Sequence, residues 1–100
     1  MPAAQVIFHR LAAREYRSSR EWYAKRSAAV AERFRLAVDR AVDRIVKEAD
    51  SLGVLVGQYR YVRVSRFPYV LIFRRLDSAV VVVVAVAHTS RRPGYWRRRW

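Results

Sequence analysis

The sequence predicts an α+β protein with a single domain over residues 1–100, in which a two-helix hairpin packs on one face of a largely antiparallel sheet. Two observations lead to this fold class. Residues 11–49 contain no glycine or proline and carry apolar side chains at helical spacing, whereas residues 59–87 change to short extended segments separated by turns. The chain of 100 residues is long enough for one core. The expected order is β-α-α-β-β-β, followed by a short C-terminal helical tail.

The first half of the chain predicts one strand and two helices. Alternating side chains favour a short first strand from about Ala4 to Phe8. A helix is expected over residues 11–26, where Ala, Arg, Glu and Ser dominate. A second helix is expected over residues 28–49, with Gly53 as its left-handed cap, because apolar residues recur there at spacings of three and four. These apolar residues are Val30, Phe34, Val38, Ala41 and Ile45.

The second half predicts three strands joined by tight turns. The strands are expected over residues 59–64, 69–76 and 79–87. Residues 65–68 form the first turn, because Pro68 has no amide proton to give to a strand ladder, and Asp77-Ser78 form the second. The last strand is almost entirely valine and alanine, so we expect it to be buried on both faces. Pro93 is expected to open a final helical turn that runs to Trp100.

The chain is strongly basic, with 21 Lys and Arg against 8 Asp and Glu and a net charge of +13. Residues 59–100 hold ten arginines and one acid, so the charge is concentrated on the expected strands and tail. Self-repulsion of this size is expected to destabilise an isolated monomer, and an anionic partner is expected, either nucleic acid or an acidic protein. The arginines predicted to bind the target or another anion are Arg60, Arg63, Arg66, Arg74, Arg91, Arg92 and Arg97.

The sequence predicts no metal or cofactor site. It has no cysteine, and two histidines without a spaced carboxylate pair make no zinc motif. Its three glycines form no phosphate-binding loop. The N-terminus lacks the features of a secretory signal, and the apolar run over residues 79–87 is less than half of the ~20 residues that a membrane helix needs. We therefore expect a cytoplasmic protein without a membrane segment.

The order of elements, together with particular residues, resembles the RelE/ParE superfamily of toxins from bacterial type II toxin–antitoxin systems. The resemblance spans nearly the whole chain and implies a small cytoplasmic toxin that a co-encoded acidic antitoxin wraps and neutralises. The matching segments lie on the expected helices, on the strands around Pro68 and at the end of the chain. They are Glu21-Trp22-Tyr23, Ala31-Glu32-Arg33-Phe34, Ala41, Ile45, Tyr61-Val62-Arg63-Val64, Phe67-Pro68-Tyr69 with residues 70–74, Ala87-His88, and Arg91-Arg92-Pro93-Gly94-Tyr95-Trp96.

The superfamily divides into RelE-like members, which cut messenger RNA on the ribosome, and ParE-like members, which inhibit DNA gyrase. RelE-like enzymes use basic residues on the central strands and a C-terminal tyrosine, which Arg63 and Tyr95 match here. Val70, however, stands where RelE-like enzymes keep an arginine. The lysines, Lys25 and Lys47, lie on the expected helices, and arginine stays protonated and cannot act as a base. The resemblance therefore favours a ParE-like, non-enzymatic inhibitor of gyrase.

A ribonuclease remains an alternative, with the ribosome and its mRNA as partners. His88 would act as the general base, Arg63 or Arg66 would hold the phosphate, and Tyr95 or Arg91 would assist. The simpler interpretation of His88 is a strand-end histidine that bonds to the backbone and packs beside the aromatic tail. A third hypothesis is a non-toxic binding module that acts with its partner in transcriptional autoregulation.

Aromatic residues supply the predicted antitoxin-binding surface. We expect an antitoxin helix to fill a groove beside the aromatic residues of the helices and to place carboxylates opposite the arginines. The same helical spacing is also typical of core residues, and the aromatic tail can equally fold back over the sheet, so these alternatives stay open. The predicted antitoxin-binding residues are Trp22, Tyr23, Phe34, Tyr95 and Trp96.

Overall fold

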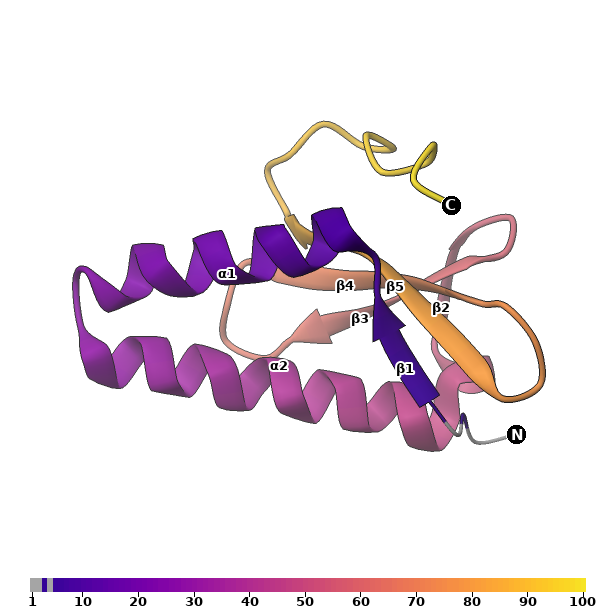
Figure 1. The fold of residues 1–100 in the computed structure, drawn as a ribbon, viewed down its shortest axis with the longest axis horizontal. Helices are drawn as coiled ribbons and strands as arrows, with labels where there is room; N and C mark the ends of the chain where they lie inside the picture. The colour runs from indigo at the N-terminus through magenta and orange to yellow at the C-terminus, as the bar shows by residue number, and fades with distance from the viewer. Residues whose placement is uncertain (1–2, 4) are drawn as a thin grey trace.

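Two α-helices and five strands make up the described part of the chain, traced by colour from the N-terminus in Figure 1. This computed structural model describes residue 3 and residues 5–100. The helices are α1 (Arg10–Ala24) and α2 (Ala28–Glu48), with a short 3-10 helix, η1 (Ala49–Ser51), after α2. The strands are β1 (Gln5–Phe8), β2 (Gly53–Val56), β3 (Tyr59–Val64), β4 (Tyr69–Arg75) and β5 (Val80–His88). The predicted α+β class and strand–helix–helix–strand order are confirmed.

The five strands form one mixed sheet in the spatial order β1-β5-β4-β3-β2. The pairs β2–β3, β3–β4 and β4–β5 are antiparallel. β1 lies parallel to β5, with Gln5 opposite Val80 and Phe8 opposite Val83. The sequence predicts three antiparallel strands after the helices, so the observed sheet is wider by β1 and β2. Ala4, the expected start of the first strand, lies outside the described residues.

The predicted left-handed helix cap at Gly53 is wrong. Gly53 begins β2 and pairs with Tyr61 of β3, and a Cβ atom at this position would lie 2.6 Å from the Tyr61 ring. Glycine is needed there to admit the ring rather than to reverse the chain. The positive φ, 56°, belongs to Gly57, which together with Gln58 turns β2 into β3.

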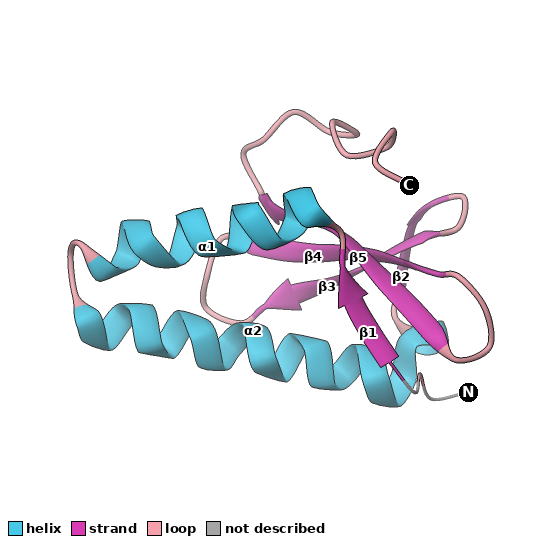
Figure 2. Ribbon diagram, viewed as in Figure 1, coloured by secondary structure: helices cyan, strands magenta, loops and turns pink. Residues whose placement is uncertain are grey.

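The tail after β5 folds into consecutive turns instead of the predicted helical turn over residues 93–100, and Figure 2 draws it as a loop. The amide of Arg97 donates to the carbonyl of Gly94 at 3.1 Å, and that of Arg99 donates to the carbonyl of Trp96 at 3.0 Å. Gly94 has a φ of 78°, in the left-handed region, so the predicted right-handed helix from Pro93 cannot run through it. The tail therefore stays compact without becoming an α-helix.

Phe34 of α2 is the centre of the core between the helices and the sheet. Its ring is fully buried and lies 5.1 to 5.9 Å, centroid to centroid, from the rings of Tyr16, Tyr23, Phe67 and Tyr69. Aromatic pairs of this geometry stabilise the fold beyond the contribution of the buried apolar area alone. Because Phe67 and Tyr69 flank the β3–β4 turn, the cluster fastens that turn to the helical hairpin.

β5 is buried on both faces, as its valine and alanine run predicts. The register with β4 shifts within the strand, since Ile72 pairs with Ala85 whereas Phe73 pairs with Val83. Such a bulge lets Val84 and Ala85 lie on the same face. The residues on the helix side are Val81, Val83 and Val86. Those on the other side are Val82, Val84, Ala85 and Ala87.

Trp96 covers the second face of β5. It is 3% exposed and belongs to the apolar cluster on that side of the sheet, where its ring meets the ring of Tyr59 at 4.7 Å. The Tyr59 hydroxyl donates to the carbonyls of Arg97 and Trp100 at 3.3 and 3.1 Å. Of the two alternatives left open by the sequence, the structure shows that the tail folds back over the sheet.

Glu15 of α1 holds the tail against the edge of β5. Its carboxylate accepts two N–H bonds from Arg99 at 2.8 and 3.0 Å and the hydroxyl of Tyr95 at 2.8 Å. The amide of Val86 also donates to this carboxylate at 3.0 Å, and Arg99 donates to the carbonyl of Val84 at 3.0 Å. β1 pairs with β5 only as far as Phe8. Glu15 and Arg99 therefore bond to backbone groups that a neighbouring strand would otherwise satisfy.

The contacts of Glu15 with Tyr95 and Arg99 make the stability of the protein depend on pH through Tyr95. Burial, followed by the hydrogen bond to Glu15 and the charge of Glu15, raises the pKa of Tyr95 above its ordinary value. The folded protein thus holds the phenol proton more tightly than the unfolded chain, in which tyrosine titrates at about pH 10. The contribution of Tyr95 to stability is full below that pH and is lost as pH rises above it.

We therefore expect the free energy of unfolding to fall more steeply above about pH 10 in the wild type than in the Tyr95→Phe variant. Urea denaturation at a series of pH values measures both curves. Burial also raises the pKa of Tyr23, but this effect is common to both proteins and cancels in the comparison. Two parallel curves would show that the Tyr95 phenol is not held in this way.

Candidate functional site

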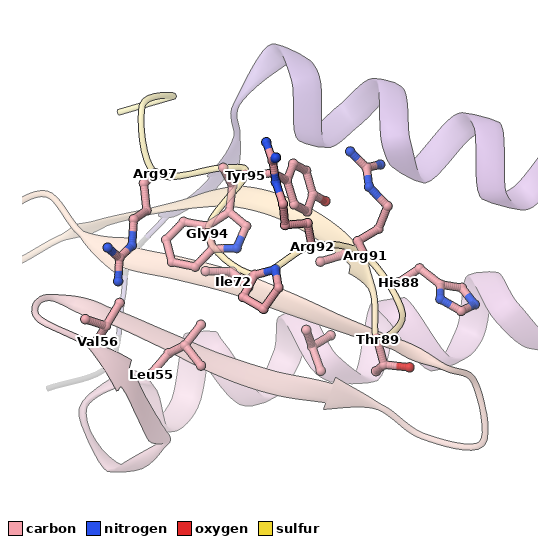
Figure 3. A pocket seen from close by; sticks show the side chains of 14 residues that line it. Leu55, Val56, Ile72, His88, Thr89, Arg91, Arg92, Gly94, Tyr95 and Arg97 are labelled. Atoms are coloured by element: carbon pink, nitrogen blue, oxygen red, sulfur yellow. The ribbon is translucent and has the colours of Figure 1, made fainter.

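A groove of about 650 Å³ lies between β2 and the C-terminal tail, on the sheet face that Trp96 partly covers (Figure 3). The side chains of Val70 and Ile72 from β4 and of Ala87 from β5 line it. Figure 3 shows Leu55 of β2 facing the tail from the opposite wall. The groove is therefore open and apolar, and it is bounded by a strand on one side and by the tail on the other.

The rim of this groove is positively charged. Arg91, Arg92 and Arg97 are exposed there, and no acidic side chain lines the groove within the described residues. Leu55 and Val56 are 46% and 38% exposed, which is high for large apolar side chains. An apolar surface framed by cations fits a partner segment that alternates apolar side chains with carboxylates.

The three residues predicted for catalysis do not gather at one site. His88 and Tyr95 line the groove, whereas Arg63 lines an adjoining hollow beside the β3–β4 turn, which shares Val70 and Thr89 with the groove. The hydroxyl of Tyr95 already donates to Glu15. The Nδ1 atom of His88 accepts the amide of Ser90 at 3.0 Å and lies 2.7 Å from the Ser90 hydroxyl.

His88 has the surroundings of a strand-end histidine. Its ring is half buried and packs edge-on against Tyr69, with centroids 5.1 Å apart. The simpler interpretation expected a backbone bond, which is confirmed, and a neighbour in the aromatic tail. The ring neighbour is instead Tyr69 of β4, because Tyr69 pairs with His88 across the ladder.

The seven arginines predicted to bind anions occupy three places rather than one surface. Three are exposed at the rim of the groove: Arg91, Arg92 and Arg97. Two are exposed beside the β3–β4 turn: Arg63 and Arg66. The remaining two, Arg60 and Arg74, are half buried beside the β2–β3 turn. Arg60 donates to the carbonyl of Leu52 at 2.6 Å, and the guanidinium of Arg74 lies 5.9 Å from the centroid of the Tyr59 ring. Arg60 therefore supports the fold, whereas the Nε atom of Arg74 is buried without a hydrogen-bond partner among the described residues.

The aromatic residues predicted to bind an antitoxin differ widely in exposure. Trp22 is 53% exposed, with the guanidinium of Arg26 3.5 Å from its ring centroid. Tyr23 and Tyr95 are half buried. Phe34 and Trp96 are core residues, one on each side of the sheet. Trp22 and the exposed parts of Tyr23 and Tyr95 thus remain available to a partner. Phe34 and Trp96 are buried in the core and are not.

Sequence reasoning missed Leu55 and Val56 on one wall of the groove, and Glu15 and Arg99, which fasten the other. A signal for the first pair exists, because three apolar residues bounded by Gly53 and Gly57 are typical of a short strand. No local signal exists for the second pair. Glu15 and Arg99 are separated by 84 positions, and each looks like ordinary surface charge in its own segment.

Residue 3 and residues 5–100 contain neither a candidate metal-binding group nor a helix suited to crossing a membrane. Within these residues, no group of three or more His, Cys, Asp or Glu side chains is arranged to hold a metal ion. No helix among them is both long enough and apolar enough to cross a membrane.

Comparison with known proteins assigns the family. A family model described as the ParE toxin of the type II toxin–antitoxin system, parDE, matches residues 6–93. No curated protein is a significant match to the chain. The matched residues run from β1 through β5 to the first part of the tail. They include the β2 wall of the groove, but they stop at Pro93 and so leave out Gly94, Tyr95, Trp96 and Arg97 of its tail wall. The predicted resemblance to RelE/ParE toxins is confirmed, and the family implies a cognate antitoxin as partner. The chain belongs to the ParE toxin family of type II toxin–antitoxin systems.

Proposed function

We propose that this toxin stops growth by binding a protein target, that the target is DNA gyrase, and that a cognate acidic antitoxin neutralises it. The observation that carries the non-enzymatic part is the arrangement of His88, Tyr95 and Arg63. The Tyr95 hydroxyl and the His88 Nδ1 atom hold structural hydrogen bonds, and Arg63 lines the adjoining hollow rather than the groove itself. A 2′-hydroxyl attack needs a base, an acid and a phosphate-binding cation around one reacting group. The ParE family match supports gyrase over the ribosome.

A ribosome-dependent endonuclease is the second candidate. His88 and Tyr95 do line the same groove as Arg91 and Arg92, so a base and two cations share one surface there. If Tyr95 assists, the ribosome must draw its hydroxyl away from Glu15, whereas assistance by Arg91 needs no such change. The two candidates differ in what they demand of His88, and this difference makes them separable.

Pulse-labelling of DNA, RNA and protein synthesis after induced expression in bacteria tests the target. We expect DNA synthesis to fall first while translation continues. We expect the His88→Ala variant to remain toxic, because His88 bonds within its own loop and packs on Tyr69. An immediate fall in protein synthesis, together with loss of toxicity in His88→Ala, would establish the endonuclease instead.

The groove is the proposed docking site for a segment of the antitoxin. Its exposed wall of Leu55 and Val56 offers apolar area, and the arginines at its rim match carboxylates on the partner. Binding there would offset part of the +13 net charge and would stabilise the toxin by mass action.

Substitution of Leu55 by Asp tests this docking site, with Val54→Asp as the matched control. Both residues lie on β2, and Val54 is the more exposed, at 59% against 46%, but only Leu55 lines the groove. We expect Leu55→Asp to weaken antitoxin binding by about tenfold or more, as truncation of an interface anchor does, and Val54→Asp to leave it within about threefold. Calorimetric titration with the cognate antitoxin measures both. Equal losses in the two variants would place the antitoxin elsewhere.

A further inference from the structure

A second basic surface lies beside the β3–β4 turn, outside the groove. It consists of Arg33 and Arg40 of α2, Arg63 of β3 and Arg66 of the turn, which we name the arginine belt. All four side chains are exposed. They line two hollows, one with Arg33 and Arg40 and one with Arg63, and both hollows include Arg66 and Phe67. The belt therefore runs continuously from the helix across the turn to the strand.

The charge of the belt is not compensated by ion pairs within residue 3 and residues 5–100. Every acidic residue of α2 pairs with a basic residue outside the belt. The pairs are Glu32 with Arg35, Asp39 with Arg35, Asp43 with Lys47, and Glu48 with Arg44. None of the four belt arginines forms an ion pair with any residue that the structure describes. Arg33 and Arg40 thus stay without an ion pair on a helix whose acidic residues all pair with other basic residues.

The backbone holds the belt in a defined shape. Arg33 and Arg40 are seven residues apart on α2, so they lie on the same side of the helix about 10 Å apart. Arg66 has a φ of 70°, a left-handed conformation that is uncommon for a residue with a side chain. The turn keeps this conformation because the amide of Phe67 bonds to the carbonyl of Val64 at 3.1 Å. The Phe67 ring also packs on Phe34.

We propose that the arginine belt binds the phosphate backbone of duplex DNA without reading its bases. Guanidinium groups on a rigid surface match phosphate oxygens, and uncompensated cations gain affinity by releasing counterions from DNA. Single-stranded nucleic acid is instead recognised largely by stacking on aromatic rings. The rings beside the belt, Phe67 and Tyr69, are committed to Phe34 in the core. The inference goes beyond the proposed function, because it needs neither gyrase nor the antitoxin.

Fluorescence anisotropy tests the proposal. A labelled 20-base-pair duplex is titrated with the 100-residue chain at several salt concentrations. The belt variant carries Arg33→Gln, Arg40→Gln and Arg66→Gly. Glycine at position 66 removes the charge and also relieves the left-handed strain, so the variant should keep its fold. The control carries Arg17→Gln, Arg20→Gln and Arg98→Gln, which removes the same charge from exposed positions elsewhere. Urea denaturation confirms that both variants are folded.

We expect the affinity of the belt variant for the duplex to be lower by about tenfold or more near 0.1 M salt. The slope of its log affinity against log salt should become shallower by about 2.7, since three phosphate contacts are lost. The control should change that slope by less than about one. Equal changes in both variants would mean that net charge alone drives binding, which overturns the proposal. Tighter belt-dependent binding of a 20-residue polyglutamate would assign the belt to an acidic protein, and tighter binding of single-stranded RNA would assign it to that ligand.

Discussion

Burial of β5 on both faces is the constraint on which the rest of this structure depends. A strand of valine and alanine that lies between β1 and β4 inside a five-stranded sheet needs an apolar cover on each side. The helical hairpin covers one side through the cluster around Phe34, and the C-terminal tail covers the other through Trp96. Glu15 and Arg99 fasten the tail where β1 ends, and this return of the tail places its arginines at the rim of the groove.

The charge of the protein follows from the same arrangement. The acidic residues of α2 form ion pairs along that helix, and Glu15 pairs with Arg99. The arginines of the groove rim and of the belt therefore stay exposed without an ion pair among the described residues. One surface combines cations with apolar side chains and fits a protein segment. The other combines cations with a rigid, strained turn and fits phosphate groups. A small toxin can in this way present two different binding chemistries on a single core.

Local patterns in the sequence explain what could be predicted. Helical spacing placed Phe34 in the core, and the valine run identified β5 as a strand buried on both faces. The parts that were missed depend on residues distant in sequence: the parallel pairing of β1 with β5, the bond between Glu15 and Arg99, and the packing of Tyr61 against Gly53. Likewise, clustering of arginines along the chain does not show that the fold divides them among a groove rim, a turn and the half-buried positions of Arg60 and Arg74.

We propose that this ParE toxin acts by binding gyrase rather than by cutting RNA. The most direct test is a supercoiling assay with purified gyrase and relaxed plasmid, in which the full-length toxin is titrated and the cognate antitoxin is then added. We expect supercoiling to stop at toxin concentrations comparable to that of gyrase and to resume when the antitoxin is added. Supercoiling at the full rate in a large excess of toxin would contradict the account.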